Sequence, residues 1–169
     1  MIALATSASL ITFAIFMVIL LGGSYKNLED AITDFTGLDI EQIELHKVTE
    51  TGDFLFAFYQ TNDLSDIRVL CLEKNLWGAF TFAGSSSTDK QVNMYQRGGN
   101  ELIVIIYGDN KVLNAKKYSF EYKNREYSND ITERYFLDLF KIANQDNKSS
   151  LVDACYFYDA QGNELATIY

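Results

Sequence analysis

The stretch that decides the fold is Glu101-Leu-Ile-Val-Ile-Ile-Tyr-Gly108. Its central run, Ile-Val-Ile-Ile at 103–106, is apolar at every position, whereas a strand with one face in water alternates between apolar and polar residues. We therefore expect a central strand that is buried on both faces. The preceding segment 91–96, QVNMYQ, and a turn at 97–100 predict that this strand forms a hairpin with its neighbour.

Other segments alternate with a period of two, which is typical of half-buried strands. The turn at Thr51-Gly52-Asp53 predicts one hairpin, and the turn AQGN at 160–163 predicts another that closes the domain. A polar loop is expected at 85–90, SSSTDK. The strands predicted in this way cover residues 43–50, 54–60, 67–74, 76–84, 116–123, 151–159 and 164–169.

The segment 131–143 is ambiguous. A capping box of Asp130 and Glu133 and the rough helical spacing of Ile131, Tyr135 and Leu139 favour a helix. The aromatic-rich run RYFLDLFKI favours a strand, and the local pattern leans slightly to the helix. With or without this segment, about eight or nine short strands predict an all-β domain, an antiparallel sandwich or a partly open barrel.

Three segments are expected along the chain. Residues 2–23 carry no charge and, at about 1.5 Å per residue, are long enough to cross a hydrocarbon core of about 30 Å. Residues 1–24 are therefore a predicted transmembrane anchor, with a cleaved signal peptide as the alternative. Residues 25–38 predict a short connecting helix, capped at Asn27 and closed by Gly37. Residues 39–169 form the β-rich domain, and the charges near the anchor do not fix its orientation.

The formal net charge is −9, and every charged residue follows position 25. Because an acidic domain repels phosphate backbones, nucleic-acid binding is not expected. Cys71 and Cys155 each lie in a predicted strand, so buried free thiols are expected, with one disulfide between neighbouring strands as the alternative. No metal site and no cofactor are predicted, because two cysteines and one histidine supply few ligands.

Any Ser-His-Asp or Cys-His arrangement would have to use His46, the only histidine. It lies in an alternating segment, so a surface or strand-face position is expected and no catalytic residue is predicted. The chain holds 11 Tyr, 12 Phe and one Trp, most of which suit core and cross-strand pairs. An exposed aromatic strip that binds a glycan or a peptide is the alternative, and its candidate contacts are Trp77, Tyr95 and Tyr107.

Five different short sequence marks lie along residues 41–169. They are a Thr-x-x-Gly turn, a Phe-Tyr strand end, a Leu-x-Lys-x-x-x-Gly segment, a Tyr-Gly pair and an Asp-x-x-Gly turn, found at 49–52, 58–59, 72–78, 107–108 and 159–162. In these marks the chain resembles a group of uncharacterised small proteins of Gram-positive bacteria that have one N-terminal membrane helix. The resemblance implies an extracytoplasmic domain and a strand at 133–142, and it implies no activity. The chain departs from the group at Ala79 to Phe82, where the group tends to have tryptophan.

The sequence therefore favours a single-pass protein of the cell membrane, and the resemblance implies that its C-terminal domain lies outside the cytoplasm. Its expected role is that of a non-enzymatic binding or sensory accessory module, with a protein, a peptide or an envelope polymer as its partner. A structural subunit of a membrane complex, held through its helix, is the alternative. An acidic hydrolase that uses a pair of carboxylates is a second alternative.

Overall fold

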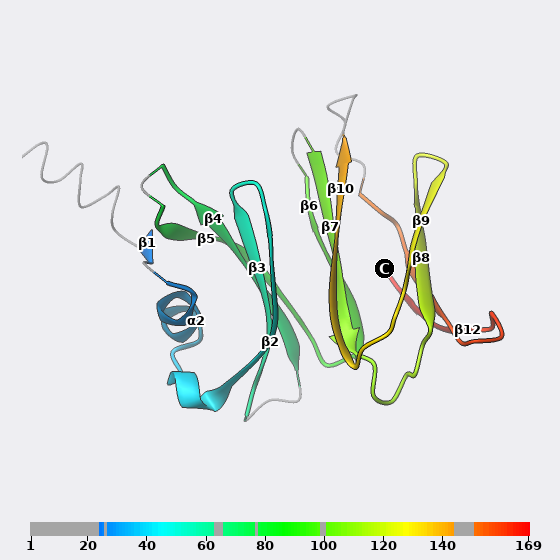
Figure 1. The fold of residues 1–169 in the computed structure, drawn as a ribbon, viewed down its shortest axis with the longest axis horizontal. Helices are drawn as coiled ribbons and strands as arrows, with labels where there is room; N and C mark the ends of the chain where they lie inside the picture. Colours follow the sequence, from blue (N-terminus) through cyan, green and yellow to red (C-terminus); the bar gives the residue numbers. More distant parts are fainter. Residues whose placement is uncertain (1–23, 26, 63–65, 77, 99–100, 144–150) are drawn as a thin grey trace, which may run out of the picture.

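The computed structural model describes residues 24–25, 27–62, 66–76, 78–98, 101–143 and 151–169. These residues form antiparallel sheets of five, three and four strands (Figure 1). The all-β prediction is confirmed, but the stacking of three sheets was not expected. Residues 1–23 of the predicted anchor lie outside the described residues, and no helix in the described part is long and apolar enough to cross a membrane.

Sheet A has the order β1-β5-β4-β3-β2, sheet B the order β10-β7-β6, and sheet C the order β12-β11-β8-β9. Sheet A consists of β1 (Ser24–Tyr25), β2 (Ile43–Thr51), β3 (Phe54–Thr61), β4 (Ile67–Lys74) and β5 (Phe80–Thr88). Sheet B consists of β6 (Val92–Arg97), β7 (Glu101–Asp109) and β10 (Tyr135–Ala143). Sheet C consists of β8 (Lys117–Tyr122), β9 (Arg125–Asp130), β11 (Cys155–Tyr158) and β12 (Glu164–Ile168).

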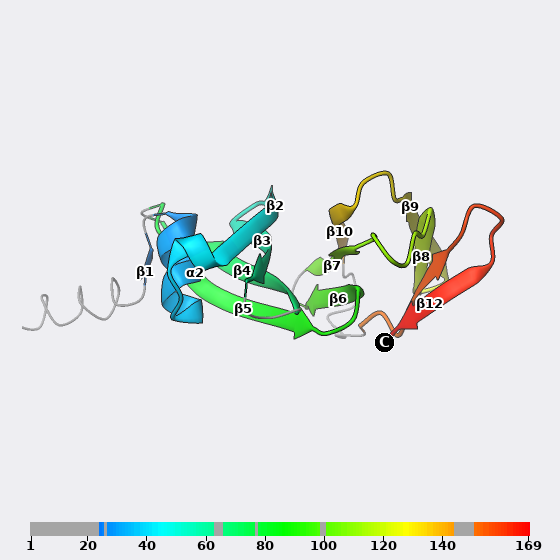
Figure 2. The ribbon, with the colours of Figure 1, turned by 90° about the horizontal axis from the view of Figure 1, so that it is seen from below.

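Sheet B lies between the other two sheets, as Figures 1 and 2 show from two directions. Strand β7 fills the predicted central position, and its buried side chains alternate between two cores. Leu102, Val104 and Ile106 contribute to the core shared with sheet C. Ile103 and its alternating neighbours Ile105 and Tyr107 contribute to the core shared with sheet A. The apolar run of the sequence therefore reflects two buried faces of one strand.

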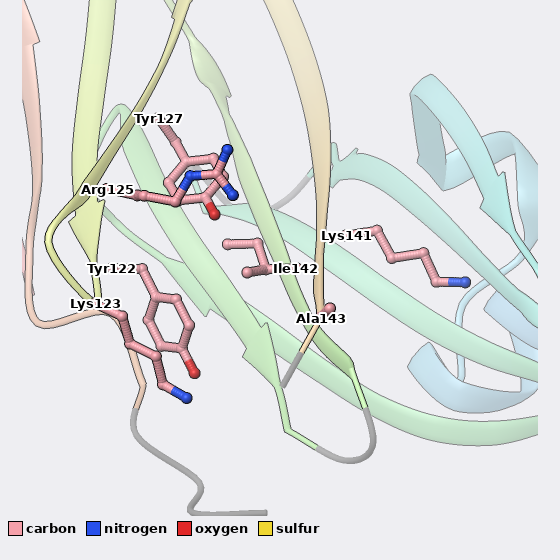
Figure 3. A pocket seen from close by; sticks show the side chains of 7 residues that line it. All are labelled: Tyr122, Lys123, Arg125, Tyr127, Lys141, Ile142 and Ala143. Carbon is pink, nitrogen blue, oxygen red and sulfur yellow. The ribbon is translucent and has the colours of Figure 1, made fainter. Parts of the chain in front are cut away.

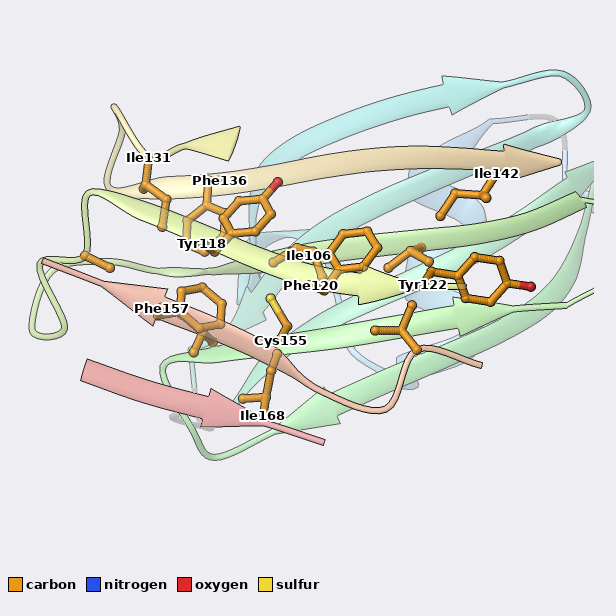
Figure 4. Close-up of a cluster of buried hydrophobic side chains, with 14 of the residues drawn as sticks. Ile106, Tyr118, Phe120, Tyr122, Ile131, Phe136, Ile142, Cys155, Phe157 and Ile168 are labelled. Atoms are coloured by element: carbon orange, nitrogen blue, oxygen red, sulfur yellow. The ribbon is translucent and has the colours of Figure 1, made fainter. Parts of the chain in front are cut away.

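The core between sheets B and C is rich in aromatic rings (Figure 4). Tyr118 and Phe120 of β8 and Phe157 of β11 are fully buried there and face Phe136 of β10. The Tyr118 hydroxyl donates a hydrogen bond to the Asp138 carboxylate at 2.8 Å, so its polar end is satisfied inside the sandwich.

The outer face of sheet A is covered by α2 (Leu28–Thr36), which is followed by the 3₁₀ helix η1 (Ile40–Gln42). The Asn27 side chain accepts a hydrogen bond from the Asp30 N–H at 2.8 Å and caps the start of α2. Gly37 ends the helix with a φ of 68°, in the left-handed region that favours glycine. The helix buries Ala31 and Ile32 against the sheet, and both predicted caps are present.

Two local predictions need correction, and one strand was missed. Residues 85–88 belong to β5 and pair with β4, so the polar loop is shorter than the predicted 85–90. Strand β9 was not predicted. Residues 135–143 form the strand β10, paired with β7 along its whole length, so the local lean to a helix was wrong. The ladder overrides the helical spacing because β7 offers a continuous partner for every residue of β10.

Candidate functional site

Different contacts join the edges of neighbouring sheets on the two sides of the stack. Between sheets A and B, Lys47 of β2 pairs with Glu133 at 2.5 Å, and the Arg97 guanidinium donates to the Ala83 carbonyl at 2.9 Å on the other side. On one side of the sandwich of sheets B and C, the Gln96 side chain bonds to the backbone of Val152, and a hollow lies between β6 and β12 on the same side. The opposite side lies between the edge strands β9 and β10. It is here that the strands leave a cleft.

The cleft has a volume of about 340 Å³. It lies between the β8–β9 hairpin and the end of β10 (Figure 3). Its lining consists of Tyr122, Lys123, Arg125, Tyr127, Lys141, Ile142 and Ala143. We call this site the β9–β10 cleft.

A tight turn presents the hairpin side of the cleft. Lys123 and Asn124 form the loop between β8 and β9, with φ values of 50° and 59°. Positive φ at both loop residues is typical of the type I′ turn, whose twist matches that of a two-stranded hairpin. The turn therefore places Tyr122 and Arg125 directly opposite each other at the mouth of the cleft.

Aromatic rings make the wall rigid. Tyr127 of β9 stacks on Phe120 of β8, with ring centroids 5.2 Å apart and an angle of 10° between the rings. The edge of Phe140 of β10 packs against the same pair. Tyr122 and Ile142 are almost fully buried and form the apolar floor. A ligand in the cleft would therefore meet preformed aromatic and aliphatic surface.

Cations lie over these rings. The Arg125 guanidinium carbon lies 5.9 Å from the centre of the Tyr127 ring, and the Lys123 ammonium lies 5.5 Å from that of Tyr122. Lys141 lines the cleft mainly with its stem, because its side chain points away in Figure 3 and its ammonium binds Glu101 at 2.6 Å. No carboxylate occurs among the described lining residues. In a chain of net charge −9, the cleft is a local site of positive charge.

A second hollow lies on the other side of the same turn. Its volume is about 540 Å³, and Tyr122 and Lys123 also line it. The rest of its lining includes Glu121, Asp153 and the half-exposed Tyr156. Charge thus changes sign across the tip of the hairpin, from cationic in the β9–β10 cleft to acidic in this hollow.

The structure does not bring the three predicted contact aromatics together on the surface. Trp77 lies outside the described residues. Tyr107 is fully buried between sheets A and B, where its hydroxyl accepts a hydrogen bond from the Asn93 amide at 3.0 Å and burial raises its pKa. Tyr95 is half-buried in the same core, with its hydroxyl beside the Cys71 thiol, and burial raises its pKa as well. In this position the two tyrosines act as packing residues.

His46 occupies a β-bulge, at which β2 shifts register against β3. Only 3% of its side chain is exposed. The ring stacks on Tyr135 at a centroid distance of 3.7 Å, and its Nε2 lies 2.9 Å from the Gln60 side-chain oxygen. The bulge turns the histidine from the edge of sheet A toward sheet B, so His46 is a packing residue between the sheets, on a strand face as expected.

Both cysteines are free and buried, in different cores. Burial raises the pKa of Cys71 to about 11, against the opposing effect of Arg97, and that of Cys155 to about 12. The thiolate is the nucleophilic form, so neither residue suits covalent catalysis. Among the described residues, no group of three or more His, Cys, Asp or Glu side chains could hold a metal ion.

Two of the carboxyl groups that the structure describes have shifted pKa values. Burial raises the pKa of Asp109, but hydrogen bonds from Arg134 and from the Lys111 N–H outweigh burial and hold it below its usual value. Hydrogen bonds from the side chain and backbone of Asn163 lower the pKa of Asp159 in the β11–β12 turn. A general acid needs a raised pKa, and both shifts run in the opposite direction.

Comparison with known proteins adds no assignment. No protein family, no curated protein and no solved structure matches the chain.

The residues of the β9–β10 cleft were missed from the sequence. The available signal was charge, because four of the 14 Lys and Arg residues fall within residues 116–125. A second signal was the Lys123-Asn124 pair between two alternating segments, which suits a hairpin turn.

Proposed function

We propose that this protein is a non-enzymatic binding module that holds an anionic ligand in the β9–β10 cleft. The observation that carries the proposal is the convergence of Arg125, Lys123 and two tyrosines on one apolar-floored cleft of an otherwise acidic chain. Guanidinium groups bind carboxylates and phosphates through paired hydrogen bonds. The half-buried Tyr127 ring adds flat contact area at a small entropic cost.

A binding role fits the chemistry of the site better than hydrolysis does. The cleft offers cations and rings but no carboxylate among its described lining residues. The described carboxyls with shifted pKa values, Asp109 and Asp159, are held ionised rather than protonated. Glycoside hydrolysis needs one carboxyl of each kind.

The uncharged segment at 2–23 supports a membrane anchor, and the resemblance to extracytoplasmic proteins supports a location on the outer side of that membrane. There the natural ligand would be an anionic envelope polymer or an acidic segment of another protein. Both carry the carboxylate or phosphate groups that the cleft would bind.

The proposal is tested by titrating the full-length chain with fluorescent polyglutamate and polygalacturonate. We expect saturable binding that weakens with salt, in spite of the repulsion from the net negative charge. Neutral dextran should not bind. If neither polyanion gives saturable binding, the proposal is wrong.

Arg125→Ala separates the cleft from the general charge of the chain. It should weaken polyanion binding by about tenfold or more, because a charge-assisted hydrogen bond contributes about 1.5–3 kcal/mol. Lys111→Ala is the matched control, since it also removes one exposed cation, from a turn outside the cleft. Equal losses in the two variants would show that the cleft is not the binding site.

A further inference from the structure

We infer that the ligand of the β9–β10 cleft is an extended acidic peptide, which adds to sheet C as a new strand beside β9. This inference rests on the function proposed above and names the class of partner. It is carried by the open edge of β9 among the described residues, by the charges on its two faces, and by the contacts that cover parts of the β10 and β6 edges.

Within the part of the chain that the structure describes, β9 is the outermost strand of sheet C and pairs only with β8. In a hairpin closed by a two-residue loop, the pair next to the loop, Tyr122 and Arg125, is hydrogen-bonded, and the bonding then alternates. The backbone N–H and C=O groups of Glu126 and Ser128 therefore point away from β8. These groups form a ladder that another strand can pair with.

The same edge borders the cleft. Arg125 and Tyr127 point into the cleft, whereas Glu126 lies on the outer face of the sheet, directly across from Glu121 of β8. A strand beside β9 would place alternate side chains into the cleft, next to Arg125, and the others on the acidic outer face. Acidic side chains suit the first set of positions, and neutral or basic ones suit the second.

Parts of two other edges of this sandwich, those of β10 and β6, make contacts of their own. The first part of β10 lies against β2, where His46 stacks on Tyr135. On the far side, the Gln96 amide binds the chain at Val152 in the way a neighbouring strand would. The end of β9 is capped, since the Asp130 N–H donates to the Asn129 side chain at 3.0 Å. Among the described residues, the part of β9 that no other segment caps or pairs on its outer edge is therefore the part beside the cations.

The decisive probe is a peptide in which Glu and Thr alternate, used with two N-methylated forms of the same sequence. One form carries methyl groups on the Glu nitrogens and the other on the Thr nitrogens, so charge and composition are equal. Strand addition uses only the N–H groups on one edge of the peptide. We therefore expect one form to bind the full-length chain roughly tenfold or more weakly than the other. Equal affinities would overturn the inference.

Two other occupants give distinct results. If polygalacturonate binds and the peptide does not, the proposed function stands and the peptide inference fails. If neither binds, both fail. If light scattering shows that the chain dimerises and that the peptide cannot displace the second copy, the occupant of β9 is another copy of this chain and the inference is wrong.

Ser128→Pro tests the same point from the side of the protein. Proline removes the outward N–H of β9 and keeps the pairing of its neighbours with β8. We expect it to abolish the difference between the two methylated peptides while polyglutamate still binds. Ser128→Ala is the control, because it keeps the N–H. A thermal unfolding transition like that of the parent establishes that the proline variant is folded, and the result with methylated peptides does not depend on it.

Discussion

Gln96 and Val152 are 56 residues apart and exchange two hydrogen bonds. The Gln96 side chain donates from Nε2 to the Val152 carbonyl at 2.8 Å and accepts from the Val152 N–H at 2.7 Å. One amide side chain thus takes the place of a strand residue and fastens the segment before β11 to the edge of sheet B.

Gln96→Ala should lower the free energy of unfolding by about 1–3 kcal/mol, because it leaves a buried N–H and a buried carbonyl of Val152 unpaired. Urea unfolding followed by circular dichroism measures the change. Gln161→Ala removes the same side chain from an exposed turn and should change stability by less than about 0.5 kcal/mol. Equal effects in the two variants would contradict this role for Gln96.

His46→Ala should destabilise the protein by about 2–4 kcal/mol, because it removes a ring packed between Phe58 and Tyr135 and leaves the Gln60 amide without its partner. Glu133→Ala removes a half-exposed ion pair from the same side of sheets A and B and should cost no more than about 1 kcal/mol. If the ion pair proves the more important of the two, the packing role of His46 is wrong.

Gly108→Ala should destabilise the protein by about 1–3 kcal/mol through overpacking. A Cβ at this position would lie 2.5 Å from the Gln91 carbonyl oxygen and 2.7 Å from the Val92 side chain. Chemical unfolding measures the cost. Ser87→Ala, at an exposed position of β5, adds no atoms and should be close to neutral.

The two thiols should not react with a disulfide reagent at pH 8 unless the chain unfolds, because both are buried and their pKa values are raised. A raised pKa in the folded state favours the neutral thiol, so its contribution to stability is complete below pH 9. The contribution is lost as the pH rises from 9 toward 11 for Cys71 and toward 12 for Cys155. A variant with alanine at both positions should lose less stability over this range. An equal loss would show that the thiols do not take part.

The fold could be predicted from the sequence where one residue pattern has one physical meaning. The apolar run of β7 could be satisfied only by burial on both faces, and Asn27 and Gly37 were recognisable as helix caps. Strand β9 could not be predicted, because five of its six side chains are exposed and carry no apolar alternation. The local pattern of β10 favours a helix, because Asp138 breaks the apolar alternation of the strand. Asp138 is tolerated there because Tyr118, 20 residues earlier in the chain, supplies its hydrogen bond.

The β9–β10 cleft could not be predicted from local sequence patterns, for a similar reason. Arg125 and Ile142 meet there only because β8 and β9 join sheet C while β10 joins sheet B. Sheet membership depends on pairing between distant segments, which neither strand encodes alone. Tyr107 was a predicted ligand contact but is buried. The local sequence around a strand tyrosine does not show whether the ring lies in the core or on the surface.

The double burial of β7 also has a consequence for how the molecule unfolds. Its odd-numbered side chains need sheet A and its even-numbered ones need sheet C, so loss of either outer sheet would expose half of a strand that has no polar face. Neither half of the stack is then a stand-alone folding unit. We expect the amide protons of β7 to exchange with solvent only through global opening, in one cooperative step.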